Sequence, residues 1–193
     1  FDRVFMKFPA DLPDMRNERS FLSSPILEDN HDYFREFATF LEARDRLILS
    51  RMVFTNRSAF SVGDVHIEVS IACPPGQHAD LFRADDVPDE PSQTYLPFGN
   101  GIHDARRKMT IDDQGLVPVV NISLGTVRPG QVVRAEEDLA IVPSAPGHYS
   151  IQARIFANEI PAPILIEHQF EVAGDVIEVG KEDFFEKVSS SGG

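Results

Sequence analysis

The chain has 193 residues, of which 42% are hydrophobic and 25% are charged, so it can build the core of one ordinary globular domain. Lys and Arg number 18 against 31 Asp and Glu, and the formal charge of −13 disfavours a surface that follows nucleic-acid phosphates. The single cysteine, Cys73, excludes an intrachain disulfide and a four-cysteine zinc site, which favours a reducing, cytoplasmic compartment. No run of about 18 apolar residues is present, so no membrane span is expected.

Residues 1–46 predict an N-terminal arm followed by one helix. Prolines interrupt residues 1–28, which we expect to be irregular and to lie over the core. In residues 30–45, Tyr33, Phe34, Phe37 and Leu41 recur at three- and four-residue steps, and Asn30 can cap the start. This pattern predicts a helix whose aromatic face packs on a sheet.

From residue 47 the hydrophobic period changes from helical to two-fold. Alternation is clearest in residues 64–73, where every second side chain is apolar, as in a strand with one buried face. Strands are predicted at residues 47–56, 64–73, 109–111, 117–124, 132–142, 149–157 and 164–172, with a short one at 175–179. Residues 74–108 break the rhythm and predict a long irregular loop.

These strands, separated by turns and by no helices, predict a mainly β protein. The specific expectation is an immunoglobulin-like antiparallel β-sandwich of about seven strands over residues 47–180, with the N-terminal helix packed on it. Residues 181–193 are expected to form a helical turn, at 181–188, and a flexible Ser/Gly tail.

Several segments carry a family resemblance. They are FTNRSAFSVGDVHIEVSI at 54–71, DDVPDEP at 85–91, NISLGTVRPGQVV at 121–133, PGHYSIQARIFANEIPAPI at 146–164 and HQFEV at 168–172. Over residues 45–173 the chain resembles an immunoglobulin-like accessory domain found C-terminal to AlbA-type, Schlafen-like DNA-binding domains of bacterial proteins. The resemblance implies an accessory role in a bacterial cytoplasmic protein, such as one of a stress or defence system, with the DNA-binding residues in the other domain.

Signals for catalysis are missing from the sequence. It contains no Gly-x-Ser-x-Gly elbow, no P-loop and no His-Glu-x-x-His motif, and Cys73 is interpreted as a small core residue. His66, His148 and His168 fall on neighbouring predicted strands, but His168 has the opposite phase, which disfavours a zinc site. We therefore expect a protein that is not an enzyme and that uses no cofactor or metal.

The candidate partner-binding residues fall in three places. They are acidic side chains of the long loop, basic side chains before residue 109, and two apolar side chains near a proline-rich turn: Asp85, Asp86, Asp89 and Glu90; Arg106 and Arg107; and Phe156 and Ile160. An outward aromatic ring beside such a turn is a plausible interface anchor.

Three functions remain open from the sequence. The first is a non-catalytic module that binds a protein partner or a neighbouring domain of the same polypeptide, where an exposed edge strand could recruit the partner. The second is a sensor in which the loop at 74–108 closes over a small molecule between sheet and helix. The third, disfavoured by the charge, is nucleic-acid binding through residues 103–108.

Overall fold

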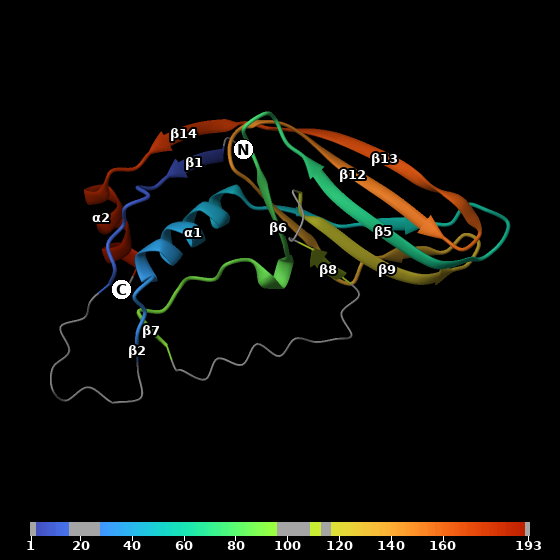
Figure 1. Ribbon diagram of the computed structural model, residues 1–193, viewed down its shortest axis with the longest axis horizontal. Helices are drawn as coiled ribbons and strands as arrows, with labels where there is room; N and C mark the ends of the chain where they lie inside the picture. The colour runs from blue at the N-terminus through green and yellow to red at the C-terminus, as the bar shows by residue number, and fades with distance from the viewer. Residues whose placement is uncertain (1–2, 16–27, 96–108, 113–116, 192–193) are drawn as a thin grey trace.

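The computed structural model describes residues 3–15, 28–95, 109–112 and 117–191 (Figure 1). Over these residues the chain is mainly β, as predicted, with α-helices near its two ends. Among the described helices, none is long and apolar enough to cross a membrane.

The largest sheet has five antiparallel strands in the order β13-β12-β5-β9-β8 (Figure 1). Their bounds are Val62–Ala72 (β5), Met109–Asp112 (β8), Val119–Val127 (β9), Gly147–Ala157 (β12) and Ile160–Val172 (β13). The predicted alternation holds in β5, where Val65, Ile67, Val69 and Ile71 are buried and the residues between them are less so.

A second layer faces this sheet and consists of two smaller sheets. One has the order β3-β11-β6 (Ile48–Ser50, Leu139–Pro143 and Ala79–Arg83), and the other pairs β4 (Val53–Thr55) with β10 (Val132–Arg134). The strands predicted at 47–56 and 132–142 are therefore each divided between two sheets. At the break, Arg51 donates two hydrogen bonds of 2.5 and 2.6 Å to the Asp138 carboxylate and holds its pKa below the ordinary range.

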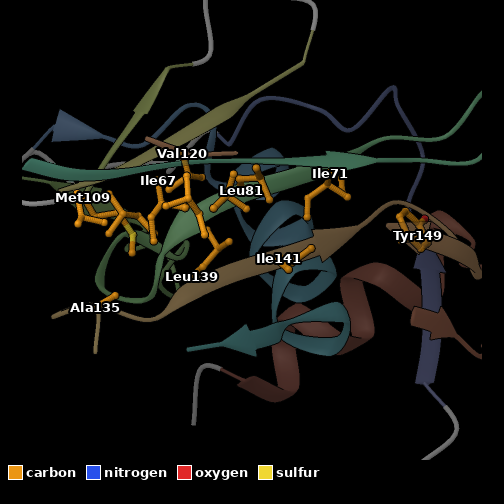
Figure 2. Packing of buried hydrophobic residues seen from close by; sticks show 14 of the residues in the cluster. Ile67, Ile71, Leu81, Met109, Val120, Ala135, Leu139, Ile141 and Tyr149 are labelled. Carbon is orange, nitrogen blue, oxygen red and sulfur yellow. The ribbon is translucent and has the colours of Figure 1, made fainter. Parts of the chain in front are cut away.

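The main core lies between these two layers. Figure 2 shows Ile67, Ile71 and Val120 of the five-stranded sheet packing on Leu81, Leu139 and Ile141 of the other layer. All are buried, and Leu139 and Ile141 have no exposed surface. Burial of these apolar side chains, which the alternation places on one face, is the main contribution to the stability of the fold.

The long loop predicted at residues 74–108 contains regular structure, which corrects that expectation. Strand β6 is followed by a 3₁₀ turn, Ala84–Asp86 (η1), and Thr94–Tyr95 (β7) pairs with Glu28–Asp29 (β2). In β6 only Ala79 and Leu81 point into the core. Two apolar positions between proline-rich and acidic stretches are too short a pattern to predict a strand from period alone.

The N-terminal arm is also more regular than predicted. Arg3–Lys7 (β1) pairs in parallel with Gly174–Glu178 (β14), which follows β13 (Figure 1). A Cβ atom at Gly174 would clash with the Arg3 carbonyl, so only glycine allows this approach. Pairing between strands so far apart in the chain leaves no local sequence signal.

The helix predicted at 30–45 is α1, Tyr33–Arg46, but its aromatic face does not pack on the five-stranded sheet. It packs on Lys181–Ser191 (α2) and on the N-terminal segment, where Phe184 lies 6.3 Å from Phe37 and 5.3 Å from Phe8, centroid to centroid. The terminal turn predicted at 181–188 is thus part of a longer helix. Phe184 and Val188, one turn apart, are buried, and this packing stabilises α2 into the segment that was expected to be a flexible tail.

Arg46 joins this helical core to the main one. Its guanidinium is buried, donates hydrogen bonds to the carbonyls of Met6 and Ser144, and lies 5.5 Å from the centre of the Phe5 ring. Glu42 supplies a counter-charge at 3.3 Å. One cation therefore contacts α1, the β1 strand and the turn between β11 and β12.

Candidate functional site

An open apolar groove of about 620 Å³ lies between strands β12 and β13 of the large sheet and the chain from β3 to β5. Isoleucines form one side of it: Ile151, Ile155, Ile160, Ile164 and Ile166. The other side is formed by Met52, Val53, Phe54 and Phe60. Among the described residues that line it, only Arg57 and His168 are ionisable.

The groove exists because the second layer does not cover the whole sheet. Along β13, the even-numbered residues Ile164, Ile166 and His168 face the groove, in register with Ile155, Ala153 and Ile151 of β12. Ile164 and Ile166 are 47% and 50% exposed, whereas Val69 of β5 is fully buried. The apolar alternation that builds the core thus continues along β13, where no opposing layer covers the side chains and they are exposed to solvent.

A hydrogen-bonded turn supports the opposite side of the groove. The buried Asn56 amide donates to the carbonyls of Phe60 and Val127, both at 2.9 Å, and its Oδ1 accepts from the N–H and hydroxyl of Ser58 at 2.9 and 2.7 Å. All its side-chain hydrogen-bonding groups are engaged, which fixes the turn. The turn holds Phe60 at the groove with 57% of its surface exposed.

The rim of the groove is the outer edge of β13. Among the described residues no strand pairs with this edge, which runs along the top of the view in Figure 1. The side chains that point away from the groove include Leu165, which is 73% exposed, and the exposed acids Glu167 and Glu171. Glu167 Oε1 accepts a 2.8 Å hydrogen bond from the hydroxyl of Ser150 on β12.

Of the two apolar residues predicted as an interface anchor, only Ile160 lies in the groove. Phe156 lies on the opposite face of the sheet, where its ring contacts His66, at 6.1 Å between centroids, and the Arg154 guanidinium, at 5.2 Å. The two side chains do not form one surface, because Ile160 pairs with Ala157 and shares its face, whereas Phe156, the residue before Ala157, points to the other face.

The charged candidates lie elsewhere. Asp85 and Asp86 form η1 and both pair with Arg83 of β6. Asp89 and Glu90 are exposed in the chain that follows. Arg106 and Arg107, together with the rest of the segment predicted to contact nucleic acid, lie outside the described residues.

A second cavity, of about 480 Å³, lies where the sensor hypothesis expects one. Residues of the 74–108 segment, including His78 and Asp80, line it on one side and α1 lines it on the other. The helix contributes Thr39, Glu42 and Arg46 and not the aromatic face that the hypothesis requires. Its lining therefore mixes apolar side chains, such as Phe82 and Val142, with charges of both signs.

Among the described residues, the ionisable side chains that line the groove are Arg57 and His168, whereas Lys7, Glu42, Arg46, His78 and Asp80 line the second cavity. Burial raises the pKa of the Cys73 thiol, which lowers its thiolate fraction at neutral pH. His168 lies in the groove, whereas His66 and His148 are on the other face of the sheet. Across the described residues, no three His, Cys, Asp or Glu side chains are placed to hold a metal ion.

No protein-family model and no curated protein matches the sequence. Among solved structures, the chain is similar to a family 123 glycoside hydrolase from Clostridium perfringens, studied for glycolipid glycan hydrolysis. The likeness covers 67% of this chain and 22% of that one, with 14% identity and a TM-score of 0.35. A likeness at this level carries no argument about fold or activity.

Proposed function

We propose that this chain is a non-catalytic accessory module for protein–protein interaction or scaffolding, folded as an immunoglobulin-like β-sandwich. The open groove beside β13 carries the proposal. Exposed Ile164, Ile166, Val53 and Phe60 gather around it, and apolar surface concentrated in this way is characteristic of binding sites. The resemblance of residues 45–173 to accessory domains of bacterial proteins supports a cytoplasmic setting in a larger protein, such as one of a stress or defence system.

Site-specific photocrosslinking tests this function. A photoreactive phenylalanine analogue at Ile166 is expected to give a discrete protein adduct in cells that make the protein. The matched control is the same analogue at Ile177 of β14, which is 49% exposed but lies outside the groove. The adduct at 166 should disappear when Phe54 on the opposite side of the groove is changed to Asp.

Two results would contradict the proposal. One is equal crosslinking from positions 166 and 177, which would show that the groove has no preferred partner. The other is turnover of a small molecule by the isolated chain that is lost on substitution of Phe54, which would make the groove an active site.

A ligand sensor is the second candidate, and the cavity between α1 and the 74–108 segment favours it. Its volume of about 480 Å³ falls within the roughly 300–1,000 Å³ common for small-molecule sites. Its ionisable lining residues, which include Glu42, Arg46 and Asp80, fit a metabolite with polar groups. Thermal-shift screening with metabolites and nucleotides should give stabilisation that His78→Ala removes, and no stabilisation by any compound would reject this candidate.

A further inference from the structure

We infer that the groove partner is a protein segment in extended conformation, which adds to the outer edge of β13 and alternates apolar with basic side chains. This inference rests on the proposed binding function and specifies how the partner is recognised. Three independent features of β13 support it: the edge that is available, the apolar row on one face and the acids on the other.

The first feature is the phase of the backbone. N–H groups alternate in direction along a strand, and Pro163 is tolerated in a sheet where its missing N–H would face away from the neighbouring strand. Leu165, Glu167 and Gln169 share the phase of Pro163, so their N–H and C=O groups face the unpaired edge.

The second feature is the row of side chains below this edge. A strand added beside β13 directs every second side chain toward Ile164, Ile166 and His168. Those side chains would also contact Phe54 and Phe60 across the groove. The added strand would therefore both extend the sheet and cover its apolar face. Apolar residues fit these positions, because most of the lining is apolar and the cation of Arg57 would repel a lysine or arginine there.

The third feature is charge on the opposite face. Side chains of the added strand that alternate with the apolar ones lie beside Leu165, Glu167, Gln169 and Glu171. A basic residue opposite each acid, four positions apart, forms a favourable cross-strand pair. The neighbouring cation on this face, Arg154, is already paired with Glu68 at 3.2 Å.

A second copy of the chain fits this edge less well. Self-pairing of β13 centred on Glu167 places that carboxylate opposite itself, and a register centred on Gln169 places Glu167 opposite Glu171. Each chain also carries a formal charge of −13, which opposes self-association. The partner is therefore of opposite charge.

Synthetic peptides test the inference on the whole chain. The probe is a fluorescein-labelled Lys-Val-Thr-Val-Lys-Val-Thr-Val peptide, followed by anisotropy. The control peptide has Glu in place of Lys. The basic peptide should bind more tightly, with an affinity that falls as salt is added. Glu167→Lys with Glu171→Lys should reverse the preference, and Glu167→Gln with Glu171→Gln should weaken the basic peptide by about two- to thirtyfold.

A backbone substitution separates strand addition from simple apolar contact. Leu165→Pro removes one edge N–H at an exposed position and should weaken the basic peptide by about fivefold or more. Leu165→Thr keeps the N–H and should bind as the parent does. Urea unfolding of both variants checks that the fold is intact.

The outcomes distinguish this inference from the proposed function. Equal binding to Leu165→Pro and the parent, or no charge preference, would overturn strand addition, while the crosslink at position 166 would still support a groove partner. Sedimentation that shows a dimer abolished by Leu165→Pro would also overturn it, with a second copy as the occupant. Failure of both the peptides and the crosslink would reject the proposed function as well.

Discussion

The middle of the five-stranded sheet and its β13 edge differ in what covers them. At β5 and β9 the inward face meets the second layer, and Val69 and Val120 are fully buried. At β13 the same face continues with Ile164 and Ile166, which are about half exposed. An apolar face thus builds core in the middle of the sheet and a groove at the β13 edge, and the difference is the presence of an opposing layer. Four sets of variants test how far the contrast between the covered and the open regions extends.

The largest effect is expected from truncation in the covered region. Ile122→Ala removes a side chain that is 1% exposed and should lower the free energy of unfolding by about 2–5 kcal/mol. Ile166→Ala, in the open region, should change it by about 0.5 kcal/mol or less. Urea denaturation measures both. A comparable loss at Ile166 would mean that the groove is closed in solution.

Arg46 tests whether the helical core depends on the main core. Arg46→Met keeps much of the side-chain volume but removes the donors to Met6 and Ser144, and should cost about 1.5–3 kcal/mol. Arg44→Met, at an exposed position of the same helix, is the control and should be close to neutral. Two separate unfolding transitions in the Arg46→Met variant would show that the Arg46 contacts couple the two cores. An unfolding midpoint equal to that of the parent would show that they do not.

The turn that supports the groove is expected to be slightly less critical. Asn56→Ala leaves the carbonyls of Phe60 and Val127 without their amide donor and should cost about 1–3 kcal/mol. Thermal unfolding measures the loss, with Ser58→Ala as a milder control. If Asn56→Ala leaves both stability and the Ile166 crosslink unchanged, the turn does not shape the groove.

The smallest effect concerns pH. Hydrogen bonds from Arg51 lower the pKa of Asp138 in the folded protein, so their stabilising contribution is present above the ordinary carboxyl value of 3.8 and is lost as pH falls through the folded value. The melting temperature of Asp138→Asn should therefore lie slightly below that of the parent at neutral pH. The difference should close in strong acid, and a difference that widens there would contradict this account.

Local patterns predicted many of the elements. The two-fold period located β5, β12 and β13, and the helical period located α1, because these patterns depend on side chains close together in the chain. The same patterns missed β6, with two inward residues, and β1, which pairs with a strand some 170 positions away. They also predicted continuous strands at 47–56 and 132–142. Each of these is divided between two sheets, near Arg51 and Asp138.

The groove was only partly predictable. Ile160 was named as a binding residue from its place beside a proline-rich turn, but Phe156 was named with it and lies on the other face. Met52 and Phe54 were not identified, because an apolar residue in a predicted strand is normally a core residue, and Phe60 fell between the strands predicted at 47–56 and 64–73. One signal was available: Leu165 interrupts the polar phase of β13, which is unusual in a strand with one wet face.

The sequence by itself determined the mainly β class and which side chains of each strand share a face, since the strand repeat of two residues is fixed by backbone geometry. Only the tertiary structure decided which of those faces are covered. Coverage depends on where the short strands β3 and β4 and their turn pass in space, and a repeat measured along one strand contains no information about the layer opposite it.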